Sequence, residues 1–220
     1  YDEAAVLQRE VATRMLERLD YIRHEPKRIL DVGAGTGFCA RHLASSYARA
    51  DIYAVDFAIN MLKQANANTG WWQRLRKPYH FIAGDAEQLP LADGSIDMLV
   101  SSLAIQWCND LDRVFAEFRR VLAPGGMLMF TTFGPDTLKE LRASWSAVDG
   151  EVHVNHFFDM HDVGDALMRH GFAEPVMDTE YITMTYRDVL TLMKDLPEFR
   201  RKLRDLERAL GSLIKATPPE

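Results

Sequence analysis

One short apolar run, ended by three closely spaced glycines, constrains this 220-residue chain most. Residues 28–32 are typical of a buried β-strand, and Gly33, Gly35 and Gly37 follow at G-x-G-x-G spacing. Glycine permits a tight turn from a strand into a helix and lets a ligand approach the backbone closely. The run therefore predicts a strand, a turn and a helix arranged around a small ligand.

Strand-like and helix-like segments alternate along the first 133 residues. The expected strands are 28–32, 52–56, 79–83, 96–101 and 127–133, and the expected helices are 4–19, 38–47, 58–68 and 111–122. The last of these helices is expected to stop at the breakers Pro124-Gly125-Gly126. This alternation predicts an α/β fold with a mostly parallel sheet and helices on both faces.

The alternation weakens beyond Phe133, so we place a soft boundary near Gly134. Residues 1–133 are expected to form a ligand-binding core with an N-terminal lid helix. Residues 134–220 are expected to form a cap, a substrate segment and the completion of the sheet. Expected in that part are helices at 137–145, 159–170, 187–196 and 199–213 and a strand at 176–183.

Charge and cysteine usage limit the location and the partners. A net charge of −6 argues against binding nucleic acid through a broad basic face. No apolar run reaches the roughly 18 residues of a membrane span, and residues 1–10 show no secretory signal. Cys39 and Cys108 are expected to be free thiols, as in a cytoplasmic protein.

Three polar residues follow the predicted strands and could complete a ligand site. Asp56 ends the second strand and could accept both hydroxyls of a ribose, and Asp85, after the third, could accept from an adenine amine. Ser101 ends the fourth strand. Each alone could equally be a helix cap or a turn residue. All three residues lie at the carboxyl ends of predicted strands, and this shared placement favours a nucleoside-like ligand. The glycine spacing differs from the G-x-G-x-x-G of NAD enzymes, which argues against a dinucleotide.

The blocks ILDVGAGTGF, VDFAINML, GDAEQLPLADGSIDMLVSS and VLAPGGMLMFTTFG resemble the class I S-adenosylmethionine methyltransferases. The resemblance implies a Rossmann-like, seven-stranded sheet with an antiparallel last strand and S-adenosyl-L-methionine as cofactor. It also implies cofactor-binding roles: Asp31 near the methionine amino group, Gly33, Ala34 and Gly35 under it, Asp56 on the ribose, Phe57 and Met61 beside the adenine, Asp85 and Ala86 at its edge, Ser101 near the methionine end, and Tyr1 and Gln8 in a lid.

Two further stretches, SSLAIQW at 101–107 and TTFGPDTLKELR at 131–142, resemble the malonyl-acyl-carrier-protein O-methyltransferases of biotin synthesis. That resemblance extends to about Leu196 and implies a malonyl group on an acyl carrier protein as substrate. The D-T-L-x-E-L-R block also occurs in methyltransferase-like assembly factors of respiratory complex I. An assembly factor and a methyltransferase for another small molecule or protein therefore stay open as alternatives.

A carboxylate acceptor is already ionised near neutral pH, so methylating it requires no general base. It does call for a cation that holds the carboxylate, and Arg142 is the candidate, with an exposed helix arginine as the alternative. Gln106 and Trp107 follow the fourth strand directly and are candidates for lining the substrate pocket, with ordinary packing as the alternative.

Other features are less informative. His153, His156 and His161 match no trusted ligand spacing, so we expect no metal site. Two basic runs, at 74–77 and 200–208, could dock an acidic carrier protein, although a solvated helix face explains the second equally well. Residues 197–220 are charged and helical in character and lack the strand pair with which the family usually ends.

Overall fold

The computed structural model describes residues 6–70, 79–147, 157–188 and 191–192. Contacts divide the chain into two units, Val6–Thr179 and the remainder. The first unit contains every strand and helix named below. In the second, the Asp188 carboxylate accepts hydrogen bonds from the backbone N (2.8 Å) and Oγ1 (3.0 Å) of Thr191. The functional boundary expected near Gly134 stays a prediction.

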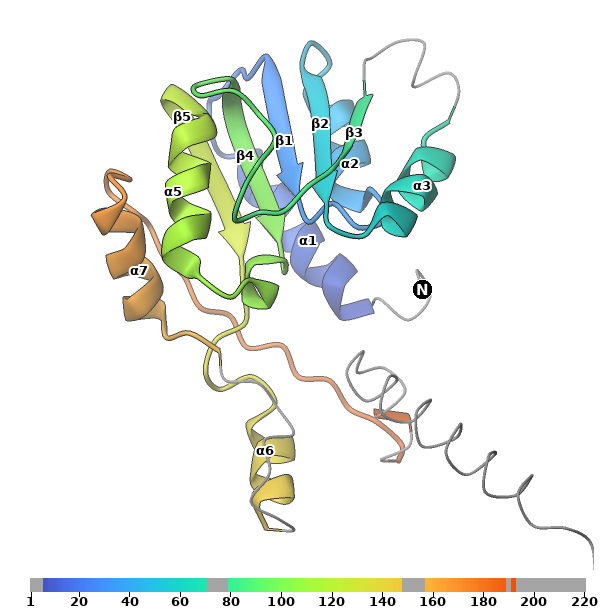
Figure 1. Cartoon of the computed structure of the whole chain (residues 1–220). Helices are drawn as coiled ribbons and strands as arrows, with labels where there is room; N and C mark the ends of the chain where they lie inside the picture. The colour runs from blue at the N-terminus through green and yellow to red at the C-terminus, as the bar shows by residue number, and fades with distance from the viewer. Residues whose placement is uncertain (1–5, 71–78, 148–156, 189–190, 193–220) are drawn as a thin grey trace, which may run out of the picture. The chain divides into compact units, whose positions relative to one another are not determined.

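Five parallel strands form the sheet, in the order β3-β2-β1-β4-β5 (Figure 1). They are β1 (Arg28–Val32), β2 (Asp51–Asp56), β3 (Tyr79–Ala83), β4 (Ile96–Ser102) and β5 (Leu122–Thr131). The helices are α1 (Val6–Leu19), α2 (Phe38–Ser46), α3 (Ile59–Asn68), α5 (Leu111–Val121), α6 (Lys139–Ser146) and α7 (Met160–Arg169), with a 3-10 turn η1 (Ile105–Trp107). The predicted α/β class and its parallel sheet are confirmed.

The apolar strands are buried on both faces because side chains alternate between two cores. Leu30 and Val32 of β1 face a cluster that includes α5, while Ile29 faces a second cluster that includes α1 and α2. Helices thus cover both faces of the sheet, as the alternation predicted (Figure 1). No described helix has the length and apolar composition that crossing a membrane requires.

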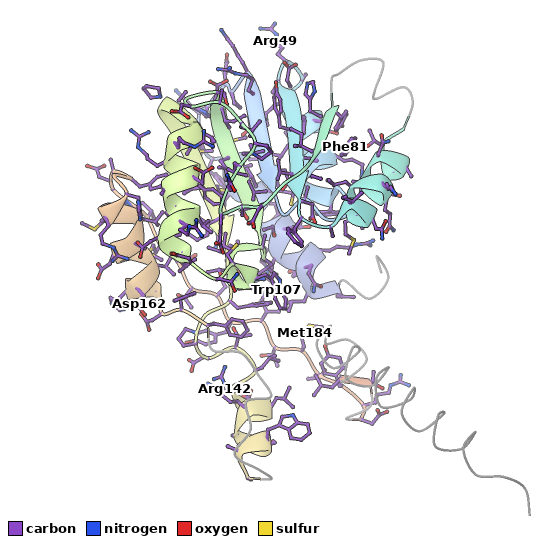
Figure 2. The ribbon with its side chains drawn as sticks, in the orientation of Figure 1. Arg49, Phe81, Trp107, Arg142, Asp162 and Met184 are labelled. Atoms are coloured by element: carbon purple, nitrogen blue, oxygen red, sulfur yellow. The ribbon has the colours of Figure 1, made fainter. Side chains whose placement is uncertain are left out.

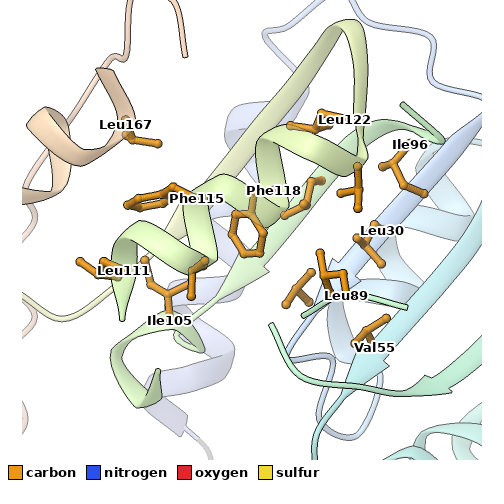
Figure 3. Close-up of a cluster of buried hydrophobic side chains, with 14 of the residues drawn as sticks. Leu30, Val55, Leu89, Ile96, Ile105, Leu111, Phe115, Phe118, Leu122 and Leu167 are labelled. Atoms are coloured by element: carbon orange, nitrogen blue, oxygen red, sulfur yellow. The ribbon is translucent and has the colours of Figure 1, made fainter. Parts of the chain in front are cut away.

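Helix α5 shows how the sequence determines one of these layers. Its large apolar residues recur at helical spacing and are all buried: Leu111, Val114, Phe115, Phe118 and Val121. Asp110 caps the helix, since its carboxylate accepts the backbone N–H of Arg113 at 3.1 Å. The Phe115 ring packs edge-on or tilted against Phe118, Phe130 of β5 and Phe172 beyond α7 (Figure 3 shows the cluster). Each fully buried phenylalanine stabilises the fold by about 2–3 kcal/mol.

The structure corrects the start of the fifth strand. Helix α5 ends at Val121, and β5 begins immediately at Leu122, before Pro124-Gly125-Gly126. The register between β4 and β5 shifts between Ile96 and Met98, so the breakers lie in an irregular strand start. Gly125 has a φ of +76°, which favours glycine and lets the chain bend there without a separate loop.

Two expectations beyond the sheet also change. Residues 176–183, which the sequence predicts as a strand, form none; Val176 is 96% exposed, and no described strand pairs with the segment. A strand needs a hydrogen-bonded neighbour, which local residue preference alone does not supply. The helix predicted at 187–196 falls largely, and that at 199–213 wholly, outside the described residues. The described sheet has five of the seven strands that the resemblance implied.

The connection from β3 to β4 runs through residues 84–95 without a helix. Arg120 on α5 holds it in place. Its guanidinium donates to both carboxylate oxygens of Glu117 (2.7 Å each), to Asp93 (2.6 Å) and to the carbonyls of Leu89 (2.9 Å) and Leu91 (2.8 Å). Glu117 also accepts the backbone N–H of Leu89 at 2.7 Å. The five N–H donors of the Arg120 guanidinium therefore anchor residues 89–93 of this connection to α5.

Candidate functional site

The strands that carry most of the predicted cofactor-binding residues end at one edge of the sheet. Parallel strands β1, β2 and β4 end there at Val32, Asp56 and Ser102, and each is followed by one of the loops that the sequence singled out (Figure 1). Open α/β sheets bind ligands at this edge.

The glycine loop is fixed by its neighbours. The backbone N–H groups of Gly33 and Ala34 both donate to the Val55 carbonyl, at 2.8 and 3.0 Å. Gly33 has a φ of +74°, and a Cβ placed on it would lie 2.2 Å from the Cβ of Ala104, after β4. Only glycine fits here, so the loop after β1 rests directly on the segment after β4.

Gly35 has the opposite environment, because a Cβ placed on it would meet nothing within 4 Å. Its N–H donates to Asp56 Oδ2 at 2.8 Å, and the N–H of Ala58 donates to Asp56 Oδ1 at 2.7 Å. Asp56 thus joins the glycine loop to the start of α3. A carboxylate has about four acceptor positions, so its oxygens can still accept two hydroxyls of a ligand.

Asp31 is the most unusual group of the site. It is 1% exposed, and its Oδ2 has no hydrogen-bond partner among the described residues. Burial raises the pKa of the Asp31 carboxyl to about 7, opposed by a hydrogen bond from the Ala40 backbone and aided by the charge of Asp56. A buried carboxylate with an unmet acceptor is costly. A ligand ammonium would satisfy both the charge and the lone pairs.

The predicted adenine-binding residues follow β2 and β3 and differ in exposure. Phe57, directly after β2, is 82% exposed, and Met61 on α3 is half-buried. Asp85 is exposed and accepts the backbone N–H of Glu87 at 2.9 Å, while Ala86 packs against the core beneath. An exposed aromatic ring and an apolar floor suit the face of a flat heterocycle.

Ser101 is placed differently from the other candidates. It is fully buried, and its hydroxyl donates to the Val32 carbonyl at 3.0 Å. That bond ties the carboxyl ends of β1 and β4 together. A cofactor contact of Ser101 therefore stays a prediction, whereas its contact with β1 is present in the protein alone.

Gln106 and Trp107 lie together on η1. The Gln106 amide nitrogen donates to the Leu103 carbonyl at 2.6 Å, while its Oε1 is buried with no hydrogen-bond partner among the described residues. Leu103 has a φ of 47°, a left-handed conformation that turns the chain sharply into η1. Trp107 is 56% exposed (Figure 2). The turn thus presents one unmet acceptor and one exposed indole.

Arg142 lies on α6, and its guanidinium donates to the carbonyls of Pro135 and Thr137, both at 3.1 Å (Figure 2). These bonds close the loop that leads into α6. The proposed contact of Arg142 with a substrate carboxylate stays a prediction.

The two predicted lid residues are not equally described. Tyr1 lies outside the described residues, and Gln8 is half-buried on α1.

The histidines that the sequence singled out are described only in part. His153 and His156 lie outside the described residues, while His161 Nδ1 lies 2.8 Å from an Asp159 carboxylate oxygen. No group of three or more potential metal ligands occurs in the part of the chain that the structure describes. The basic runs at 74–77 and 200–208 are outside as well.

Both cysteines are unpaired, as predicted. Burial raises the pKa of the Cys108 thiol to about 11, and that of the buried Cys39 thiol well above its usual value. Neither is a thiolate near neutral pH, so neither is suited to nucleophilic chemistry.

Sequence reasoning missed Glu87, Glu117 and Arg120. Glu87 Oε1 accepts the backbone N–H groups of Asn109 (2.7 Å) and Asp110 (3.3 Å). Each of the three residues makes contacts 20 or more positions away, so periodicity carried no sign of them. A charged residue with a low exposed fraction is the signal that finds Glu87, whose side chain is 12% exposed.

Comparison with known proteins gives a consistent result. A family model described as a methyltransferase domain matches residues 30–130. A malonyl-[acyl-carrier protein] O-methyltransferase of Gallionella capsiferriformans is 53% identical over 98% of this chain and 75% of its own length. A protein of the same name from Laribacter hongkongensis is 54% identical over 89% of this chain and 67% of its own.

Solved structures share the fold. One is a complex between the Haloferax volcanii Trm112 methyltransferase activator and a methyltransferase, with a TM-score of 0.63, 20% identity and coverage of 77% of this chain and 71% of that chain. Another is a Haemonchus contortus phosphoethanolamine N-methyltransferase in complex with S-adenosyl-L-methionine, with a TM-score of 0.59, 22% identity and coverage of 91% and 44%. At these identities the likeness concerns the fold alone.

Proposed function

Because this chain belongs to the malonyl-[acyl-carrier protein] O-methyltransferase family, we propose that it methylates the free carboxylate of a malonyl thioester on acyl carrier protein. The methyl donor in this proposal is S-adenosyl-L-methionine, and the step belongs to biotin synthesis. Residues up to 133 bind the donor, and the part from 134 onward contributes to the acceptor site.

The buried carboxylate of Asp31 carries the cofactor assignment. Its unmet oxygen calls for a cationic donor of hydrogen bonds, which the α-ammonium of the methionine end provides. Asp56, held by two backbone amides, is suited to accept the ribose hydroxyls, and the open side of Gly35 leaves room for close approach. Phe57 offers its exposed ring to the adenine. The donor set therefore fits this cofactor.

When bound, the cofactor supplies a methyl group on a positively charged sulfur. The malonyl carboxylate is ionised at neutral pH, so the chain need supply no general base. Its residues instead hold the acceptor oxygen in line with the methyl–sulfur bond and exclude water. The bound cofactor would accept the electron pair of the methyl–sulfur bond on its sulfur, so the chain would need no further group to receive it.

Two side chains are proposed to orient the acceptor. Arg142 grips the carboxylate through paired hydrogen bonds, for which its guanidinium exchanges the Pro135 and Thr137 carbonyls for the substrate. Gln106 and Trp107 line the acceptor pocket from η1, where the indole shields the reaction from water. Neither task requires a proton transfer.

Mass spectrometry tests the proposal directly. Malonyl carrier protein incubated with the enzyme and the cofactor should gain the mass of one methylene group, and a carrier protein without the malonyl group should gain nothing. Asp56→Ala should abolish cofactor binding measured by calorimetry, whereas Asp51→Ala, at the opposite end of β2, should keep it.

Two results would overturn these assignments. Unchanged cofactor binding by Asp56→Ala would refute the cofactor site. A wild-type protein that binds the cofactor but never methylates the malonyl carrier protein would refute the substrate and favour another acceptor or an assembly factor.

A further inference from the structure

Three loops must keep a fixed relation if a methyl donor and an acceptor are to meet. They are the glycine loop after β1, the connection after β3 that carries Asp85, and the segment after β4 that carries η1. The first and third touch where Gly33 packs on Ala104. The side chain of Glu87 makes a hydrogen-bonded link between the second and the third.

Glu87 lies two residues after Asp85, and its own backbone N–H donates to the Asp85 carboxylate at 2.9 Å. Its side chain extends the other way. Oε1 accepts the N–H of Asn109 at 2.7 Å and that of Asp110 at 3.3 Å, and Oε2 lies 3.8 Å from the Arg113 guanidinium. The side chain is 12% exposed, so water competes little for these bonds.

The two amides that Glu87 holds, those of Asn109 and Asp110, follow η1 after one intervening residue, Cys108. Within η1 the N–H groups of Trp107 and Cys108 donate back to Ala104 and Ile105 at 3.1 Å each, which makes the turn one short rigid piece. Fixing Asn109 and Asp110 therefore fixes the end of the turn that carries Gln106 and Trp107. Its start is fixed by the contact between Ala104 and Gly33.

The rest of the connection after β3 is held without Glu87. Glu117 and Arg120 anchor Leu89 and Leu91 to α5 through hydrogen bonds to the backbone of these two residues. Two largely buried carboxylates thus hold different parts of this connection. Glu117 attaches it to α5, and Glu87 attaches the predicted adenine edge to the predicted acceptor loop.

We propose that Glu87 is a positioning residue that keeps η1 in register with the cofactor-binding loop, so that cofactor binding at Asp85 orders Gln106 and Trp107 for the acceptor. This inference rests on the proposed function for its catalytic consequence, but its structural part requires only that the cofactor binds.

Amide hydrogen exchange tests the structural part without any acceptor. In wild-type protein, cofactor should slow exchange in a peptide spanning residues 105–110. Glu87→Ala should speed exchange there and lose most of the protection that cofactor gives. Glu87→Gln keeps a carbonyl acceptor for the two amides and should retain that protection, while the exposed Arg113 can move aside. Glu87→Asp, which keeps the charge but is one methylene too short, should behave like the alanine variant.

Turnover tests the catalytic part. Because a misplacement of about 1 Å can cost about 100-fold in rate, Glu87→Ala should lower kcat by about 10- to 100-fold, with a cofactor Kd within about 3-fold of wild type. Glu87→Gln should restore kcat. Combined with Gln106→Ala, the loss should be less than the product of the two single losses, since both act on one turn.

Glu117→Ala is the matched control, since it removes a carboxylate of similar burial, 18% exposed, from the same connection. It should lower Tm yet leave kcat and the protection of 105–110 near wild type. If Glu87→Ala lowers Tm but keeps both kcat and that protection, the proposal is wrong and Glu87 only stabilises the fold. If wild-type protein fails to methylate, the substrate proposal falls while the exchange experiment still decides the role of Glu87.

Discussion

The glycine loop and the α6 segment differ in how their functional side chains are held. Around the loop, Asp56 is held by two backbone amides, and Gly33 is wedged against Ala104. Helix α6 has no buried residue, and Arg142 on it donates to carbonyls of the preceding loop. The contacts of the proposed cofactor site are therefore present in the protein alone, and we expect the proposed acceptor site to depend on what binds there.

The largest expected effect comes from a substitution in the glycine loop. Gly33→Ala puts a Cβ 2.2 Å from that of Ala104 at a φ of +74°, so the loop or η1 must move. We expect unfolding in denaturant to require about 2–4 kcal/mol less free energy, with loss of cofactor binding.

Gly35→Ala is the companion variant, because its Cβ meets nothing. It should cost about 1 kcal/mol in stability yet still weaken cofactor binding, since the methyl group occupies the open side of the loop. Equal stability losses in the two variants would contradict the described packing.

Arg142→Ala tests the α6 segment. We expect kcat/KM for the malonyl carrier protein to fall by about 100-fold, because a carboxylate loses its paired hydrogen bonds, while cofactor affinity changes little. Steady-state kinetics and calorimetry measure the two quantities. Loss of cofactor affinity in this variant would show that the two proposed sites are not independent.

Asp31→Asn should separate stability from function. Burial raises the pKa of Asp31 to about 7 in the fold, so the folded state binds more protons than the unfolded state between about pH 4 and 7. The contribution of Asp31 to stability is therefore fully present below about pH 4 and is lost as pH rises through 7.

At pH 8 the neutral asparagine should make the ligand-free protein more stable than wild type by about 2 kcal/mol, while weakening cofactor binding. Urea unfolding at pH 5 and pH 8 checks the sign, because the gain should shrink at the lower pH. A gain that is larger at pH 5 would contradict the raised pKa.

Ser101→Ala is expected to have the smallest effect. Its hydroxyl donates to Val32, so its loss should cost about 1 kcal/mol in stability. Cofactor affinity should hardly change if the hydroxyl serves only this bond. A tenfold weaker Kd would instead assign Ser101 to the cofactor, as the sequence predicted.

The strands of the fold could be predicted because buried parallel strands are short apolar runs ended by turn residues. β1 and β3 lie where the sequence places them. The start of β5 was predicted wrongly, since helix α5 passes into the strand without the loop that Pro124 and Gly125 suggest. The strand predicted at 176–183 was wrong, because no described strand pairs with that segment.

The site residues also fall into those that local sequence patterns identify and those that only the folded chain reveals. Asp56 and Asp85 follow their strands, so local patterns identified them. The link from Glu87 to Asn109 joins residues 22 positions apart across two loops, and only the folded chain brings them together. The unmet oxygens of Asp31 and Gln106 are likewise properties of burial and are invisible in composition.

The fork of Arg120 bears on how related chains should be compared. All five of its N–H groups have acceptors, two of them main-chain carbonyls of the β3–β4 connection. Lysine would preserve the charge at this position but brings three donors on a single atom, which cannot reach acceptors spread over that width. When related sequences are aligned at position 120, arginine and lysine should count as different residues. A relative with lysine there would need other contacts to hold its β3–β4 connection in place.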